Sequence, residues 1–167
     1  MKKFESFENM PGLKKRFIGH LQTNKVKKCL ELFDTIDSVD SLKLIKKISN
    51  EASRKGAIFP VLLEINTSEE QQKYGFSPHQ IDEILKCFNE TSVNIEGLMT
   101  IGPLSQDKQK TRKSFKQLKE LQIAINKQLG AHQIKELSMG MSGDYEIGVE
   151  EGSTMIRVGT VLYGKRD

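Results

Sequence analysis

The sequence lacks several features that define well-known classes of protein. It has no tryptophan, only two cysteines and only four prolines among 167 residues. Two cysteines cannot build a disulfide framework. Cys29 and Cys87 both lie on apolar faces of predicted helices, so we expect buried free thiols. No cluster of histidine, cysteine and carboxylate side chains has the spacing of a metal site, and no metal is predicted.

Long apolar runs are also absent. No segment approaches the roughly 20 residues that a membrane-spanning helix needs, and the N-terminus has no apolar stretch typical of a signal peptide. We therefore expect a cytoplasmic protein without a membrane partner. Neither GxGxxG nor GxxxxGK[ST] follows any predicted strand, which disfavours a dinucleotide or nucleotide site.

Basic residues slightly outnumber acidic ones, 26 against 22, for a net charge of +4. Many of the lysines lie in the first sixth of the chain, but no aromatic interleaving and no nucleic-acid-binding module accompanies them. A solvated basic surface explains them better, and we expect no nucleic acid partner. With 37% hydrophobic and 29% charged residues, the composition predicts one globular domain over residues 1–167.

Apolar periodicity predicts an alternation of strands and helices. After an irregular lead-in over residues 1–13, strands are expected over 16–19, 35–39, 59–67, 95–101, 137–139 and 155–158. Helices with one apolar stripe are expected between them, the longest over 106–129, and the last strand precedes a short basic tail. This alternation predicts a parallel sheet with crossover helices, either an open doubly wound sheet or a TIM-type barrel.

The C-terminal stretch over residues 136–167 combines the features of an anion site. Gly140 permits a tight turn, Ser142 can cap the short helix that follows, and Arg157 is a cation inside an apolar strand. Small residues follow that strand at once. Backbone N–H groups near glycines, hydroxyl groups and a helix N-terminus together favour a phosphate site. From spacing alone, an ordinary turn with a surface arginine is an equally consistent reading.

Several stretches of the chain form a specific combination of motifs. They are FIGHLQTNK (17–25), VDS (39–41), EIN (64–66), KYGF (73–76), EGLMTIG (96–102), and LSMGMS (137–142) through GSTMIRVGT (152–160) to GKRD (164–167). This combination resembles the pyridoxal-phosphate homeostasis protein family over almost all of the chain from Arg16 onward. The fold of that family is similar to the barrel domain of alanine racemase, so the resemblance implies an α/β fold of the TIM-type (β/α) barrel kind.

The resemblance also implies a function. It implies a cytoplasmic protein that binds pyridoxal 5′-phosphate (PLP) in vitamin B6 homeostasis, without established catalytic turnover. It implies that Ser142, Gly159 and Thr160 form the phosphate cradle and that Arg157 faces the pyridine nitrogen. A guanidinium keeps its proton at ordinary pH, so the ring nitrogen stays unprotonated and the ring is a weak electron sink. Such a site binds PLP but suits carbanion chemistry poorly.

Two further residues are candidates for the cofactor site. His20 lies in the loop after the first strand, where a local hydrogen-bonding role is equally consistent with the sequence. Asn66 lies near the carboxyl end of the strand over 59–67, which is the ligand end of a barrel strand. We therefore favour Asn66 over Glu64 as the residue of this strand that contacts a ligand.

The chain departs from the family pattern at its N-terminal side. The family's imine-forming lysine lies on the first barrel strand, ahead of the region matched here, and a complete (β/α)₈ barrel takes about 250 residues. We therefore expect an incomplete barrel of about six βα units, without the first two strands and without a lysine on the main strands. The open edges of such a sheet suit a second chain. A racemase-like PLP enzyme and a structural fragment completed by another chain are the alternatives.

Overall fold

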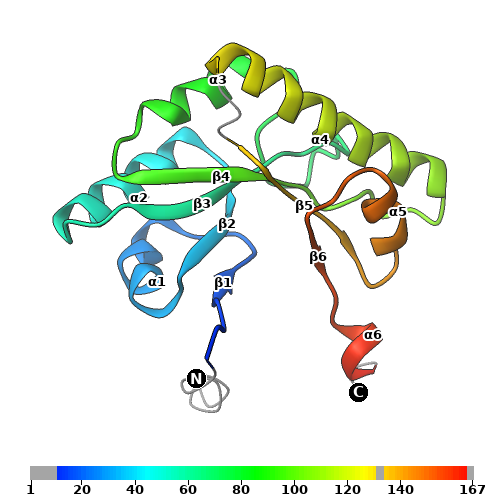
Figure 1. Ribbon diagram of the computed structural model, residues 1–167, viewed down its shortest axis with the longest axis horizontal. Coiled ribbons are helices and arrows are strands. Elements are labelled where there is room, and N and C mark those ends of the chain that lie inside the picture. The colour runs from blue at the N-terminus through cyan, green and yellow to red at the C-terminus, as the bar shows by residue number, and fades with distance from the viewer. Residues whose placement is uncertain (1–10, 131–133, 165–167) are drawn as a thin grey trace.

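Six parallel strands form one curled sheet in the computed structural model, which describes residues 11–130 and 134–164 (Figure 1). The strands are β1 (Arg16–Phe17), β2 (Thr35–Val39), β3 (Phe59–Glu64), β4 (Val93–Met99), β5 (Glu136–Met141) and β6 (Met155–Arg157). They pair in chain order, and every neighbouring pair is parallel. A doubly wound sheet would reverse its strand order at a switch point, so the barrel prediction is confirmed, as an incomplete barrel.

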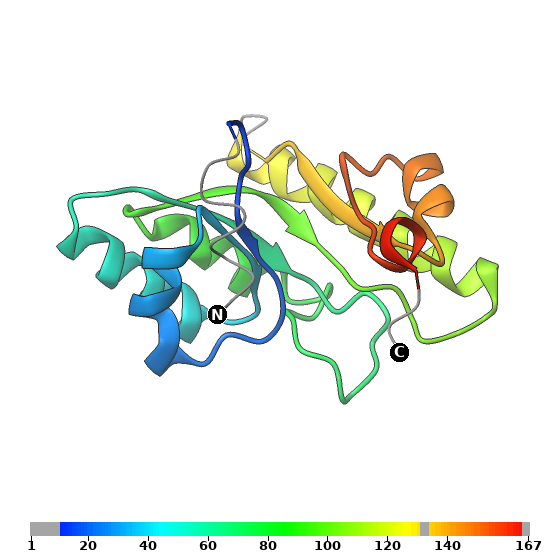
Figure 2. The same cartoon turned by 90° about the horizontal axis from the view of Figure 1, so that it is seen from below.

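The main helices lie on the convex side of this sheet. They are α1 (Val26–Leu32), α2 (Leu42–Arg54), α3 (Ile81–Lys86) and α4 (Lys108–Leu129). Two short helices, α5 (Tyr145–Glu150) and α6 (Thr160–Tyr163), flank β6, and single 3-10 turns cover Thr23–Lys25 and Cys87–Asn89. In Figure 1, α2, α3 and α4 arch over the sheet, and Figure 2 shows the same arrangement from below. The other face of the sheet is concave and carries the polar residues described below.

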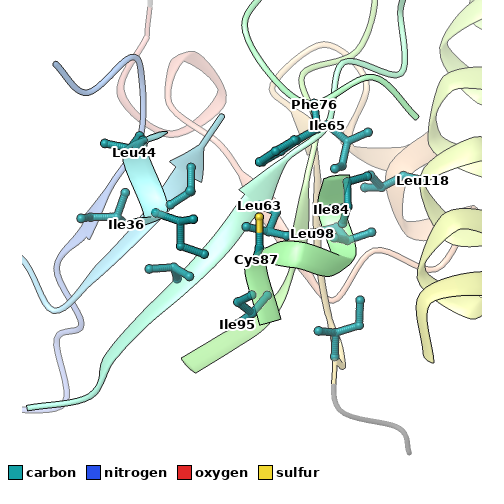
Figure 3. Packing of buried hydrophobic residues seen from close by; sticks show 14 of the residues in the cluster. Ile36, Leu44, Leu63, Ile65, Phe76, Ile84, Cys87, Ile95, Leu98 and Leu118 are labelled. Carbon is teal, nitrogen blue, oxygen red and sulfur yellow. The ribbon is translucent and has the colours of Figure 1, made fainter. Parts of the chain in front are cut away.

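The apolar core lies between the sheet and these helices. The predicted helical stripes supply one side of it, and alternate strand residues supply the other (Figure 3). Members of this core labelled in the figure include Ile36, Leu63, Ile65, Ile84, Leu98 and Leu118. Cys29 and Cys87 are free and buried, as predicted. Burial raises the pKa of Cys29 to about 11 and that of Cys87 to about 12, so both thiols are inert at neutral pH.

The element boundaries differ from the prediction in two informative places. β3 ends at Glu64 because the chain then pairs with its own loop: Asn66 N–H donates to the Phe76 carbonyl at 2.9 Å, and Phe76 N–H donates to the Glu64 carbonyl at 2.8 Å. After β6, helix α6 begins at Thr160, where the sequence predicted only a basic tail.

Parts of the predicted ends lie outside the described residues. Of the lead-in over 1–13 only residues 11–13 are described, with a turn at Pro11 and Gly12, and of the basic tail residues 165–167 are not described. Within the described ranges, every helix is too short or too polar to span a membrane.

Candidate functional site

Polar side chains gather on the concave face, near the carboxyl ends of the strands. Leu63 and Ile65 pack among the helices, so Glu64 between them points to the concave side (Figure 3). Leu137 and Met139 likewise belong to the core between sheet and helices, so Ser138 between them also points to the concave side. The carboxyl end of the strands is where barrel proteins bind their ligands.

Arg157 at the end of β6 is fixed by two neutral acceptors. Its Nη1 donates to the Ser138 hydroxyl at 2.7 Å, and its Nη2 donates to the Thr100 carbonyl at 2.8 Å. Burial lowers the pKa of this guanidinium, and the nearby carboxyl groups of Asp144, Asp37 and Glu64 oppose that shift. No carboxylate in the described part of the chain forms a contact ion pair with Arg157. Its charge is therefore available to a ligand on the concave face.

Ser142 does not cap α5, so that part of the prediction was wrong. The N-cap position belongs to Asp144, whose carboxylate accepts from the Met141 N–H at 2.6 Å. The Ser142 hydroxyl instead accepts from the Gly159 N–H at 3.0 Å and from the Val161 N–H at 3.4 Å. These bonds join the loop after β5 to the start of α6. Because they occupy the hydroxyl oxygen, its proton is left for an acceptor such as an anion oxygen.

Two glycines shape this region in different ways. Gly140 has φ 97°, and a Cβ added there would lie 2.9 Å from Tyr145 Cα, so the predicted tight turn does require glycine. Gly159 has φ −129°, outside the left-handed region, and an added Cβ would meet nothing within 4 Å. Its missing side chain leaves open space beside Ser142 and Thr160, which suits a cradle for a phosphate group.

His20 and Asn66 both have local partners. His20 Nδ1 lies 3.0 Å from the Asp40 carboxylate, and its ring stacks on Tyr74 with centroids 3.9 Å apart. The Asn66 amide donates to the Glu70 carbonyl at 2.9 Å and accepts from the Ser68 hydroxyl at 3.0 Å. The amide of Asn66 therefore stabilises its own loop, whereas Ser142 is hydrogen-bonded to Gly159 at the start of α6.

Glu64 is a further candidate on the concave face, besides Asn66, which the sequence favoured. Its side chain is buried, and no donor among the described residues bonds its carboxylate. Burial raises the pKa of Glu64 to about 7; Asp40 adds to the shift, whereas Arg157 and His20 oppose it. Because residues 59–63 are almost all apolar, the sequence does not show which strand residues point to the concave side, as Glu64 does.

The comparisons with known proteins show the family of the chain. The alanine racemase N-terminal domain family matches residues 11–167. The pyridoxal phosphate homeostasis protein of Aquifex aeolicus is 36% identical over 99% of this chain and 72% of its own length. The human protein of that name is 39% identical over 94% of this chain, and the match spans 60% of its length. The chain therefore belongs to the pyridoxal phosphate homeostasis protein family.

Solved structures support the same assignment. PipY of Synechococcus elongatus, solved with PLP bound, superposes with a TM-score of 0.87 at 33% identity, over 98% of this chain and 76% of PipY. Alanine racemase of Clostridium difficile superposes with a TM-score of 0.80 at 21% identity, over 97% of this chain and 42% of that enzyme. The second likeness shows the shared fold alone.

The lysines of the described residues lie outside the strands. The six described strands contain no lysine. Lys73, in the loop between β3 and α3, donates from Nζ to the Gly102 carbonyl at 2.7 Å and pairs with the Glu70 carboxylate at 2.8 Å. These two contacts fix the Lys73 side chain between its own loop and the segment after β4. The described residues thus suit the phosphate and ring nitrogen of PLP, and none of the described strands carries a lysine that could form an imine.

Proposed function

We propose that this chain is a PLP-binding barrel domain that serves intracellular PLP homeostasis without catalytic turnover. The proposal rests on the environment of Arg157. Its guanidinium lies on the concave face and forms no contact ion pair with any described residue, and open space remains at Gly159. Ser142, Gly159 and Thr160 would hold the phosphate, and Arg157 would face the pyridine nitrogen. The PLP bound in PipY supports this assignment.

The same residues explain why binding does not lead to turnover. Bound PLP supplies an electrophilic aldehyde and a ring that accepts electrons. Arg157 cannot give its proton to the ring nitrogen, so it weakens the ring as an electron acceptor. Since no described strand offers a lysine, the chain binds the cofactor through its phosphate and ring.

A titration of the purified chain with PLP tests the proposal. We expect saturable binding, and Arg157→Gln should weaken it at least about tenfold because a charge-assisted contact is lost. Arg54→Gln is the matched control, since Arg54 is an exposed α2 arginine that pairs with Glu51 far from the concave face. Borohydride reduction followed by intact mass should show no stoichiometric adduct. One pyridoxyl group trapped at a single lysine would contradict noncovalent binding.

We further propose that a second polypeptide covers the open edge of the sheet at β6. The residues that support this are apolar and exposed: Ile156 by 38%, Val161 by 56%, Leu162 by 65% and Tyr163 by 85%. Such a patch beside an unpaired strand edge favours association. Sedimentation of the purified chain should show a species heavier than the monomer, and Leu162→Lys should shift it toward the monomer. We also place the protein in the cytoplasm, which suits its two reduced, buried thiols.

A further inference from the structure

Glu64 is an acid without a described protein donor on the concave face of the sheet. The residue is only 7% exposed, and its carboxylate has no hydrogen-bond donor among the described residues. Its position is nevertheless well fixed, because its backbone carbonyl accepts from the Phe76 N–H at 2.8 Å and β3 pairs on both sides. A buried carboxylate without a donor raises the free energy of the folded state, and a cation bound beside it recovers that loss.

Two basic side chains act on Glu64, and their donors are directed elsewhere. Arg157 and His20 both act on Glu64 electrostatically. The Arg157 guanidinium, however, donates to Ser138 and Thr100, and the His20 ring pairs with Asp40. The described strands contain no lysine that could neutralise the Glu64 carboxylate. The carboxylate of Glu64 is therefore a vacant acceptor for a cationic group of a ligand.

The chemistry of the B6 phosphates places such a group on the correct side of the ring. The substituent at C4′ is attached para to the ring nitrogen. A ligand whose ring nitrogen faces Arg157 on β6 therefore directs this substituent away from β6, toward Glu64 at the end of β3 and the His20–Asp40 pair in the loops after β1 and β2. The substituent is an aldehyde in PLP, a hydroxymethyl group in pyridoxine 5′-phosphate, and an ammonium-bearing aminomethyl group in pyridoxamine 5′-phosphate.

We propose that Glu64 makes this site selective for pyridoxamine 5′-phosphate over the B6 phosphates whose C4′ substituent is uncharged. The inference rests on the proposed function, since it assumes that Arg157 and the cradle at Gly159 set the orientation of the ring. The ammonium group would donate a charge-assisted hydrogen bond to the Glu64 carboxylate. A bond of this kind at a buried position gives about tenfold or more in affinity.

Calorimetric titration of the whole chain with two ligands tests the inference at mildly alkaline pH. Pyridoxamine and pyridoxine 5′-phosphate differ only in the ammonium and hydroxyl groups, and neither forms an imine with surface lysines. We expect the wild-type chain to bind the amine at least about tenfold more tightly. In Glu64→Gln the amine should bind as weakly as the alcohol, while the affinity for the alcohol stays within about twofold. Glu120→Gln, an exposed substitution on α4, should behave as wild type.

The outcomes separate this inference from the proposed function. Equal wild-type affinities, or a preference that persists in Glu64→Gln, would overturn the selectivity but leave B6 phosphate binding standing. Absence of binding by both ligands would overturn both. If Glu64→Gln does not fold, the test is instead the pH dependence of the ratio between the wild-type affinities for the amine and the alcohol. It should fall as the pH drops below about 7, where Glu64 takes up a proton among Asp40, His20 and Arg157. A preference that does not change with pH would contradict the role of Glu64.

Discussion

Replacing Glu64 by glutamine should stabilise the fold at neutral and alkaline pH. The pKa of Glu64 is raised from 4.5 to about 7, chiefly because the folded chain buries the carboxylate. Between these pH values the folded state holds a proton that the unfolded state has released. The free energy of unfolding therefore falls as the pH rises from about 4.5, and the loss is complete above about 7. At about 1.4 kcal/mol per pKa unit, the loss is on the order of 3 kcal/mol.

Urea unfolding followed by circular dichroism measures this loss directly. Wild type and Glu64→Gln are compared at several pH values from about 4.5 to about 8, and the difference between their unfolding free energies is plotted. We expect the variant to gain on wild type by about 3 kcal/mol across this range. Glu51, Glu69 and Glu70 have lowered pKa values and give the opposite slope, but both proteins carry them, so their effect cancels.

Two results would refute this reasoning. Parallel curves for wild type and Glu64→Gln would mean that the Glu64 carboxylate is as well solvated in the folded chain as in the unfolded chain. A variant that loses stability with rising pH relative to wild type would mean that the ionised carboxylate has a cationic partner in the folded chain. Glu120→Gln, on the exposed face of α4, should follow wild type at every pH and guards against a general effect of removing one charge.

Three further substitutions test the cradle, the turn and the core. Gly159→Ala places a methyl group in the open space beside Ser142, so it should weaken PLP binding several-fold in the titration and leave the urea midpoint unchanged. Gly140→Ala should destabilise the fold by about 2 kcal/mol or more in urea, because its φ is 97° and the added Cβ would lie 2.9 Å from Tyr145 Cα. Phe115→Ala removes a fully buried α4 side chain and should lower the free energy of unfolding by about 3–5 kcal/mol.

The barrel architecture could be predicted largely from apolar periodicity. The strand over 35–39 was placed correctly, and the stripe of Phe115, Leu118, Leu121 and Ile125 on α4 does face the core. Periodicity works for these elements because each long helix needs one apolar face against the sheet. The choice of a barrel over a doubly wound sheet needed the family resemblance, because alternation alone fits both architectures.

The site was harder to predict because its details depend on contacts between distant segments. Ser142 has the sequence pattern of a helix cap, yet its hydroxyl binds the Gly159 and Val161 N–H groups brought beside it by β6. Asn66 was favoured for its place at the end of a strand, but the strand stops before it. Glu64 was passed over because Asn66 lies nearer the carboxyl end of the predicted strand. In each case the local sequence was consistent with more than one tertiary environment.

The two halves of the site are supported unequally, and this has a consequence for ligand binding. Arg157 is tied to Ser138 on β5 and to Thr100 after β4, so its position depends on interior strands. The cradle depends on two hydrogen bonds that Ser142 accepts from the Gly159 and Val161 N–H groups at the start of α6, a four-residue helix without buried residues. The proposed ring contact is therefore built into the sheet, whereas the proposed phosphate cradle depends on a weakly packed segment. Any polypeptide that covers the exposed apolar side chains of α6 would fix the cradle and raise affinity without touching the ligand.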